Sequence, residues 1–431
     1  MEKLFKLKEN GTTVSREIAA GLTTFLTMAY ILAVNPGMLG SIGDGMTPEA
    51  VFTATIIASV IGMLVMAFAA NLPIALAPGM GLNAFFTYTV VLGMGYSWRI
   101  ALAAVFCEGI VFIILSFFNV REALVKAIPA NLKYAVAVGI GLFITMIGLG
   151  NSGVMVRDEA TFVALGDLTS GSALTALIGF VIMTVLYVRK VPGAILIGII
   201  ITTLAGIPLG VTVIPQNFSP LSLPAAPLLF QFDFSTLLSL KFFTVFFTFL
   251  FVDIFDTVGT LVGITTQAGL IKKDGEIPRV KQAFFADAVG TAAGAALGTS
   301  TVTSYIESAS GVAAGGRTGL TAISTAALFM LSLFLSPLFL LIPGAATAPA
   351  LIMVGFLMIQ SVVNINFKDP TEGIPAFFTI FMMPFAYSVA QGIVFGVITY
   401  VVLKLASGKI KDISLVTFIL SLIFIIQIIL K

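Results

Sequence analysis

The sequence predicts an all-α polytopic membrane protein with about 14 transmembrane segments. Three observations lead to this class: 58% of the 431 residues are hydrophobic, only 10% are charged, and the mean hydropathy is +1.11. A soluble protein carries roughly 25% charged residues and needs them to cover its surface. The composition therefore excludes a soluble enzyme. A net charge of +2 without a basic cluster also excludes a nucleic-acid-binding protein.

The predicted segments are apolar stretches of roughly 20 residues, long enough to cross a lipid bilayer. A further apolar run, residues 413–430, either spans the membrane or lies at its interface. No signal peptide is expected, because the first 15 residues are polar and charged. The 14 segments lie near residues 16–36, 48–70, 72–93, 97–118, 131–150, 172–188, 192–210, 238–263, 281–297, 299–314, 319–342, 347–365, 373–387 and 389–405.

Lysine and arginine residues in the loops predict the orientation. With a cytoplasmic N-terminus and 14 crossings, 18 of the 22 basic residues fall on the cytoplasmic side; the exceptions are Arg99, Arg157, Lys241 and Lys431. The asymmetry supports an even number of crossings, because a missed segment would reverse every later loop. We therefore predict a multi-pass protein of the cell (plasma) membrane, with long outer loops at 151–171 and 211–236.

Two pairs of segments indicate a weak internal repeat. Pro-Ala precedes an apolar helix at 129–130 and at 349–350, in segments 5 and 12. Residues 71–86 and 298–312, in segments 3 and 10, each combine an extended first half with a helix-compatible second half. Both pairs lie seven segments apart, so the repeats would be inverted in the membrane. Interrupted segments in matching positions indicate a transport site at the midplane, although Pro-Ala and Gly-rich stretches also arise there by chance.

The chain has 20 acidic residues, one cysteine (Cys107) and no histidine. A single thiol and no imidazole leave no expected metal site, and no cofactor is expected. Any proton handled near neutral pH is therefore left to carboxyl groups. A charge in lipid costs roughly 3 kcal/mol or more, so acids inside segments must be protonated, hydrogen-bonded or in contact with a wet cavity. Five acids fall there without a deep basic partner: Glu108, Asp253, Asp256, Asp287 and Glu307.

Asp253 and Asp256 have the i, i+3 spacing that places both near one face of a helix, and Thr257 and Thr260 extend this polar stripe. A polar face inside a bilayer must contact protein or water. The alternative is a structural role, in which the carboxyls bind hydroxyl groups of neighbouring helices. The same structural role is the favoured interpretation of Glu108 and Asp287.

Glu307 follows a Thr/Ser run that allows an extended backbone, and a half-helix is expected to start near Ser304. Glu307 is then either a capping-box residue or a ligand-binding carboxylate at a helix start inside the membrane. Asn83 follows a Pro-Gly break in segment 3, and its amide can both donate and accept. Phe85 and Phe86 could stack on a planar ring, although contact with lipid or core is favoured for both.

The chain resembles the nucleobase–cation symporter-2 family, specifically its AzgA-like branch of purine permeases. The resemblance spans nearly the whole chain and rests on long strings. These are GLTTFLTMAYILAVNP (21–36), IALAPGMGLNAFF (74–86), FVDIFDTVGTL (251–261), TQAGL (266–270), GTSTVTSYIESASGVAAGGRTG (298–319) and TAPALIMVG (347–355).

This resemblance implies two inverted repeats of seven segments, with short strands in segments 3 and 10 that cross at the midplane. It implies a core domain (1–118 and 237–343) that moves, by an elevator or rocking motion, against a gate domain (119–236 and 344–431). It also implies import of hypoxanthine, guanine or adenine with a cation, usually H⁺, and a homodimer. The preferred purine, the choice between H⁺ and Na⁺, and the oligomeric state stay open.

Carried over residue by residue, the resemblance implies a purine site. Gly259 fixes the register that makes Asp256 the segment-8 carboxylate. Substrate-binding roles fall to Glu307, Asp256, Asn83, Asp253, Thr260 and an aromatic neighbour, Phe86 or Phe85. Proton coupling falls to Glu307, Asp256 and Asp253, because buried carboxyls that lie close together can titrate near neutral pH without histidine.

Two other classes of membrane protein fit the sequence less well. An anion exchanger of the same general fold is disfavoured, because five acids without a basic partner repel anions. An intramembrane aspartyl protease needs two aspartates on different helices, commonly within a GxGD-type sequence. Asp253 and Asp256 share one helix here, and no such sequence occurs. We therefore expect a transporter and not an enzyme.

Overall fold

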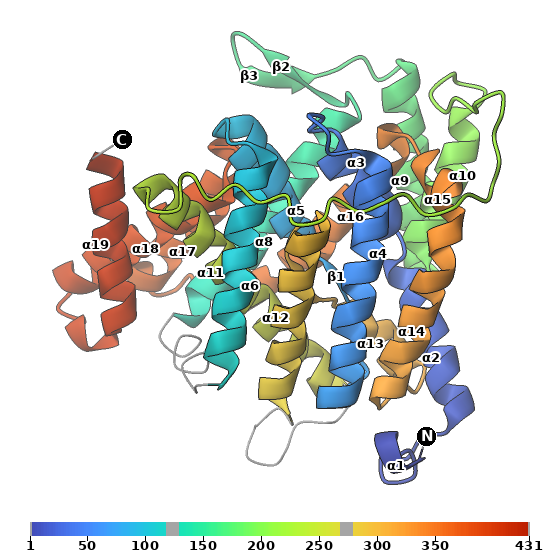
Figure 1. Ribbon diagram of the computed structural model, residues 1–431. Helices are drawn as coiled ribbons and strands as arrows, with labels where there is room; N and C mark the ends of the chain where they lie inside the picture. The colour runs from blue at the N-terminus through green and yellow to red at the C-terminus, as the bar shows by residue number, and fades with distance from the viewer. Residues whose placement is uncertain (1, 118–128, 268–278, 430–431) are drawn as a thin grey trace.

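The computed structural model describes residues 2–117, 129–267 and 279–429 (Figure 1). Long helices run between the two ends of the molecule. The N-terminus lies at one end, and a small hairpin, β2 (Met155–Asp158) with β3 (Phe162–Leu165), lies at the other (Figure 1). The long connection over residues 207–239 crosses that same end. The N-terminus and both predicted outer loops are therefore on opposite sides, as the sequence predicts.

The first half of the chain is helical apart from one short strand at the centre and the β2–β3 hairpin. Its remaining elements are α1 (Glu2–Phe5), α2 (Val14–Met28), α3 (Ile31–Gly40), α4 (Pro48–Val65) with a π-helical turn (Met66–Ala70), β1 (Leu76–Pro78), α5 (Met80–Ala84) with a π-helical continuation (Phe85–Gly93), α6 (Trp98–Phe117), α8 (Ala130–Asn151), α9 (Gly171–Val188) and α10 (Ala194–Gly206).

The second half follows the same plan, again with one central strand. Its elements are α11 (Leu240–Gln267), α12 (Val280–Leu297), β4 (Val302–Ser304), α13 (Ser308–Ala313), α14 (Gly319–Ser332), α15 (Ser336–Leu340), α16 (Gly344–Ile359), α17 (Pro370–Phe385), α18 (Val389–Ala406) and α19 (Leu415–Ile429), with short 3₁₀ turns at Leu333–Leu335, Gln360–Asn364 and Ile410–Asp412.

Helix starts follow the side chains that can cap them. A hydroxyl or carboxylate at the N-cap accepts a hydrogen bond from a backbone N–H group of the first turn, which has no partner inside the helix. This holds for α2, α4, α9, α14, α17 and α18, whose N-caps are Thr13, Thr47, Ser170, Thr318, Asp369 and Ser388.

The two central strands pair with each other, although they are more than 200 residues apart. β1 and β4 are antiparallel, with Ala77 opposite Thr303, and Gly79 N–H donates to the Thr301 carbonyl at 3.0 Å. Each strand leads into a short helix, α5 or α13. The prediction of a short strand and a half-helix in segments 3 and 10 is confirmed.

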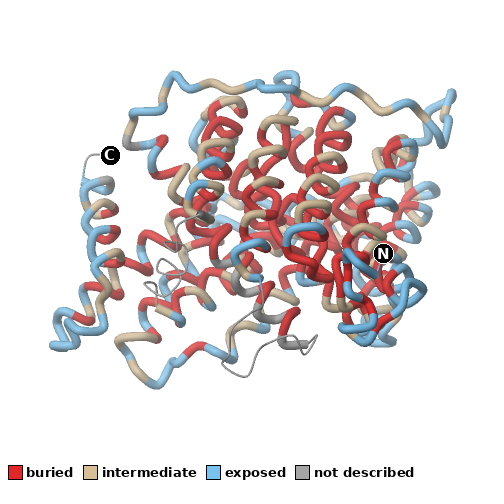
Figure 2. Tube along the Cα trace, turned by 60° about the horizontal axis from the view of Figure 1, so that its bottom comes forward, coloured by how far each residue is buried: buried red, intermediate tan, exposed pale blue. Residues whose placement is uncertain are grey.

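Each predicted segment contains a helix or one of these strand–helix units. Among the residues that the structure describes, eight helices are long and apolar enough to cross a membrane, and three shorter helices are also apolar. The fold is thus that of a polytopic helical membrane protein, while the count of 14 crossings stays a prediction. Buried residues gather in the middle of the molecule, and α19 lies at its edge (Figure 2).

One local expectation from the sequence is wrong, and two buried charged residues were not foreseen. Pro129 is the N-cap of α8, but Pro349 lies inside α16 and not before it. Glu17, not counted among the acids inside segments, has no exposed surface. Lys404, counted among the basic residues of the cytoplasmic side, is only 2% exposed in the last turn of α18, where it pairs with Glu372 at 2.7 Å.

Candidate functional site

A cavity of about 540 Å³ lies where the crossing strands meet α11, α8 and α16. Small-molecule sites commonly enclose roughly 300–1,000 Å³, so the cavity fits one small ligand. Its polar lining comes from both sides: Tyr30, Asp256, Thr260, Ser304, Tyr305 and Glu307 on one side, and Lys133, Tyr134, Ser361 and Asn364 on the other. The remaining lining is mainly aliphatic.

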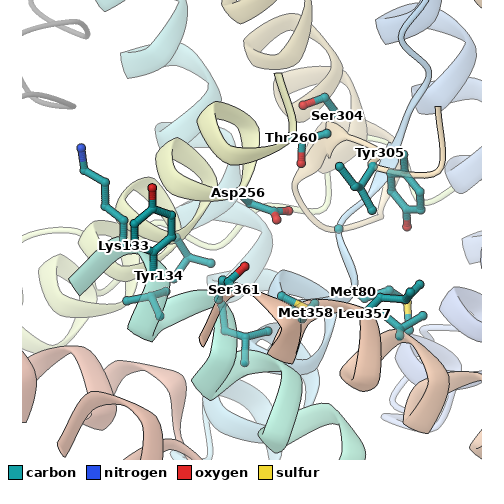
Figure 3. Close-up of a pocket in the computed structure, with 18 of the residues that line it drawn as sticks. Met80, Lys133, Tyr134, Asp256, Thr260, Ser304, Tyr305, Leu357, Met358 and Ser361 are labelled. Atoms are coloured by element: carbon teal, nitrogen blue, oxygen red, sulfur yellow. The ribbon is translucent and has the colours of Figure 1, made fainter. Parts of the chain in front are cut away.

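Asp256 and Thr260 enter the cavity from α11. They are four residues apart, so they lie on the same face of the helix one turn from each other. In the view of Figure 3, the Asp256 carboxyl lies between Lys133 and Tyr134 on one side and Thr260 and Tyr305 on the other. Glu307 lines the same cavity, so two carboxyl groups meet there. The cavity thus has an electronegative centre.

Glu307 reaches the cavity from the second crossing unit. It is the N-cap of α13, makes no side-chain capping bond, and accepts a 2.7 Å hydrogen bond at Oε1 from the Tyr30 hydroxyl. The expected helix start near Ser304 is therefore wrong, because Ser304 is still the last residue of β4 and α13 begins at Ser308. The capping-box interpretation of Glu307 is wrong for the same reason.

Gly79 allows the two crossing strands to approach each other closely. A Cβ atom at this position would lie 2.6 Å from Cγ2 of Thr303 and 3.6 Å from Oδ2 of Asp256. Real Cβ atoms do not approach neighbours within 3.0 Å, so a side chain here would push the strands apart. The glycine therefore keeps the two strands close together at a point that lies beside the Asp256 carboxyl.

Asp253 lies behind the cavity and not in its lining. It is fully buried, and its Oδ1 accepts from Thr257 at 3.4 Å. Thr257 also donates to Asp287 at 3.0 Å and shares a 2.8 Å hydrogen bond with Thr303 of β4. These groups join α11 and α12 to the crossing strand.

Asn83 also holds the crossing strands. Its amide nitrogen donates to the Pro78 carbonyl at 3.4 Å, and its oxygen accepts from Ser300. Nearby, Thr301 donates to Glu108 Oε2 at 2.8 Å. Glu108 and Asp287 thus make hydrogen bonds between elements, as the structural interpretation expects.

Phe85 and Phe86 are fully buried and pack against Phe249, with ring centroids 4.8 and 6.3 Å apart. Neither ring lines the cavity. Of the predicted site residues, the structure therefore brings Asp256, Thr260 and Glu307 together in the lining. Asn83, Asp253 and Phe86 lie in the layer behind it, and a substrate-binding role for each stays a prediction.

Seven polar lining residues were not predicted: Tyr30, Lys133, Tyr134, Ser304, Tyr305, Ser361 and Asn364. Ser304 and Tyr305 belong to the extended stretch that precedes Glu307, so that interruption was the available signal. Lys133 lies in the first turn of α8, four residues after Pro129. Its position near the start of a segment was the available signal that it could reach the cavity. The residues next to Tyr30 in sequence are apolar, so no local pattern predicts that its hydroxyl enters the cavity.

The part of the cavity lining that lies near the start of α8 is exposed. Ala130, Tyr134 and Asn364 are exposed lining residues. They lie toward the end of the molecule that holds the N-terminus, because α8 ends beside the β2–β3 hairpin at the other end (Figure 1). Past Ile140, which is the last α8 residue in the lining, helix α8 packs closely against its neighbours.

Aromatic rings fill the space beyond Ile140. Phe143 lies edge-on to Tyr387 at 5.3 Å, and Tyr387 lies edge-on to Tyr88 at 6.2 Å. Asn151 donates to the Tyr88 hydroxyl at 3.0 Å. Tyr88 follows α5, whereas Phe143 and Asn151 belong to α8 and Tyr387 lies between α17 and α18. These contacts close the cavity on the side away from the exposed lining residues Ala130 and Tyr134.

Bilayer-length helices around a central polar cavity, formed where two broken segments cross, define a membrane transporter. The sequence model of a permease family matches residues 15–423. The chain belongs to this family, the nucleobase–cation symporter-2 family, which confirms the resemblance seen in the sequence. It is therefore a permease and not an enzyme.

Two relatives match over nearly their full length. The adenine permease AdeP of Escherichia coli is 44% identical over 430 residues, covering 100% of this chain and 96% of AdeP. The guanine/hypoxanthine permease PbuO of Bacillus subtilis is 46% identical over 433 residues, covering 98% and 99%. Among solved structures, the transmembrane domain of a cyanobacterium bicarbonate transporter, BicA, has a TM-score of 0.66 at 15% identity, covering 89% of this chain and 97% of BicA's domain. That likeness concerns the fold alone.

Proposed function

We propose that this permease imports purine nucleobases, namely hypoxanthine, guanine or adenine, by symport with protons across the plasma membrane. The observation that carries the proposal is the meeting of Asp256 and Glu307 in one cavity, from two different elements. The names of AdeP and PbuO support the substrate class, because both relatives align with the whole chain.

The chemistry of a purine matches this lining. A purine is flat and mostly apolar on its faces, with N–H and amino donors and carbonyl or ring-nitrogen acceptors around its edge. An ionised carboxylate only accepts hydrogen bonds, so Asp256 and Glu307 suit the donors. The hydroxyl of Thr260 can donate to an acceptor on the same edge. The aliphatic lining then contacts the ring faces.

Protons are the proposed coupled cation because the site offers them acceptors without histidine. Two carboxyls that share a buried site do not both carry charge easily, so at least one takes up a proton during a cycle. Protonation would neutralise the occupied site and lower the cost of moving it through the membrane. The entering proton would leave on the cytoplasmic side together with the purine.

Alternating access is proposed as the transport motion, with the predicted core domain moving against the predicted gate domain. Its support is the asymmetry of the cavity, which opens beside Tyr134 and is closed beyond Ile140 by Tyr88 and Tyr387. With a cytoplasmic N-terminus, this form faces inward. The outward form would require the Tyr88–Tyr387 contact to separate.

An anion carrier is the alternative that the BicA likeness raises. Lys133 lines the cavity, but Asp256 and Glu307 line it too, and their charges would repel an anion. The fold likeness at 15% identity does not favour one substrate over another. Uptake of labelled bicarbonate or sulfate that exceeds purine uptake would overturn the purine proposal.

The test is uptake of labelled hypoxanthine, guanine, adenine and uracil by cells that lack their own purine carriers, with and without a proton gradient. We expect purine uptake that collapses when the gradient is dissipated. Glu307→Gln and Asp256→Asn should each abolish it at normal surface expression, whereas Glu49→Gln, at an exposed acid, should not. Unimpaired uptake in both site variants would contradict the proposal.

A further inference from the structure

We propose that Tyr30 is a positioning residue of the purine site, which acts by holding the Glu307 carboxyl in the orientation that receives a purine N–H group. The inference rests on the proposed function, because it assigns a role to Tyr30 within that same site. Tyr30 and Glu307 are 277 residues apart in sequence, and the fold brings them together.

The geometry ties the phenol to one oxygen of the carboxylate. The Tyr30 hydroxyl lies 2.7 Å from Glu307 Oε1, and both residues line the cavity. Tyr30 is only 1% exposed, so its hydroxyl must find a partner inside the protein. Glu307 is that partner. A hydrogen bond between a hydroxyl and an ionised carboxylate is among the stronger ones in proteins.

The backbone around this pair is equally constrained. Gly311 of α13 packs so closely on α2 that a Cβ atom there would lie 2.7 Å from the Ala20 carbonyl oxygen. Thr27, in the last turn of α2, donates to the Glu307 carbonyl at 3.4 Å. The segment from Thr27 to Tyr30 therefore contacts both the main chain and the side chain of Glu307.

Glu307 needs such a contact because of where it stands. As the N-cap of α13 it makes no side-chain capping bond, and a glutamate side chain has three rotatable bonds. A carboxyl that must be ordered on binding loses rotamer entropy at that moment, which weakens affinity. Tyr30 restricts the carboxyl before the ligand arrives. It uses one of roughly four acceptor sites of the carboxylate and leaves others for the purine.

Tyr305 does not share this task, although it is the other buried tyrosine of the lining. Its hydroxyl donates to the Pro78 carbonyl at 2.5 Å and is committed to the strand crossing. Among the side chains that the structure describes, Tyr30 donates the hydrogen bond to the Glu307 carboxylate. Tyr30→Phe removes this one hydroxyl and keeps the ring.

The experiment compares KM and Vmax of labelled hypoxanthine and adenine uptake for wild type, Tyr30→Phe and Tyr400→Phe. Tyr400 is the matched control: it is 3% exposed, its hydroxyl donates at 3.1 Å to the Asp412 carbonyl, and it does not line the cavity. For Tyr30→Phe we expect KM to rise by about 10-fold, as loss of pre-organisation predicts, with Vmax per surface molecule within about twofold. Tyr400→Phe should leave KM unchanged.

Two results would overturn the role of Tyr30. One is a KM for Tyr30→Phe equal to that of the wild type at equal Vmax. The other is an unchanged KM with a Vmax lowered by poor expression, which would mean that Tyr30 supports only the stability of the fold. If uptake is too low to fit, equilibrium binding of labelled hypoxanthine to the purified protein gives Kd in place of KM.

Glu307→Gln in the same assay separates this inference from the proposed function. If Glu307→Gln transports normally, the purine site itself is wrong, and with it the role of Tyr30. If Glu307→Gln fails while Tyr30→Phe keeps a normal KM, the purine site stands and only the role of Tyr30 is lost.

Discussion

Gly81 and Ile140 meet at the closed end of the cavity: a Cβ atom on Gly81 would lie 2.5 Å from Cγ2 of Ile140. Gly81 belongs to the half-helix α5, and Ile140 belongs to α8. Both residues line the cavity. The contact therefore joins the crossing unit directly to the layer that it would have to slide past during transport.

We predict that Gly81→Ala slows purine uptake about 10-fold, because an added methyl against a stiff β-branched side chain costs roughly 1–3 kcal/mol of overpacking. Ile140→Ala in the same chain should restore most of the rate by making room. Gly150→Ala is the control, since a Cβ there meets nothing within 4 Å. The measurement is the rate of uptake per molecule at the cell surface. Equal rates for Gly81→Ala and Gly150→Ala would show that the Gly81–Ile140 contact does not limit transport.

A second prediction concerns the aromatic closure on the far side. Tyr88 and Tyr387 face each other edge-on at 6.2 Å, and the chain has one native cysteine, Cys107, which Cys107→Ser removes. In that background, Tyr88→Cys with Tyr387→Cys, joined by a short cleavable cross-linker, should stop uptake if this end must open. Cleaving the linker should restore it. Either cysteine alone with the same reagent is the control, and full uptake by the cross-linked protein would show that the closure is static.

The interrupted segments and the lining acids were accessible from sequence because both depend on local signals. Proline, glycine and β-branched residues favour an extended backbone, and they predict the strands around Pro78 and Val302 without knowledge of distant contacts. Asp256 and Thr260 follow from helical spacing. The spacing was less decisive for Asp253, since residues three apart on a helix still differ by about 60° around its axis. That angle separates a carboxyl in the cavity from one that binds Thr257.

The features that sequence missed depend on partners far along the chain. Glu17 stands near the start of a segment, where a solvated acid is the natural expectation, and its partners are 300 or more residues away. Lys404 is buried because the turn after α18 brings Asp412 to 3.2 Å from its ammonium group. Tyr30 carries its hydroxyl into the cavity from an otherwise apolar stretch. The spacing of residues along the sequence does not predict such pairings, because only tertiary packing creates them.

Glu17 supports a third prediction, on stability. Its carboxylate accepts backbone N–H bonds from Arg317, Thr318 and Thr321, and both threonine hydroxyls at 2.8 and 2.6 Å, so it caps the start of α14 from α2. Glu17→Ala leaves these buried donors without an acceptor, which should lower the free energy of unfolding by on the order of 3 kcal/mol. Thermal unfolding of the detergent-purified protein measures it.

The control for this prediction is Glu49→Ala, which removes an exposed acid from the first turn of α4. Glu17→Gln should fall between wild type and Glu17→Ala, because the amide keeps one acceptor oxygen. A melting temperature for Glu17→Ala that matches Glu49→Ala would mean that water replaces the carboxylate at no cost.

The last prediction is a pH dependence outside the membrane. Lys409 donates to Asp369 at 2.7 Å and, with two further hydrogen bonds from Thr371, holds the pKa of this carboxyl well below its usual range. A lowered pKa stabilises the fold at every pH above the unfolded value of about 3.9, and the benefit disappears as pH falls toward the folded value. Asp369→Asn should therefore melt below wild type at pH 7, and the gap should narrow below about pH 4. Lys409→Met should show the same pH dependence, whereas Lys411→Met, at an exposed lysine nearby in sequence, should not. A difference in melting temperature that stays constant from pH 7 to pH 3 would show that the charge of Asp369 contributes nothing.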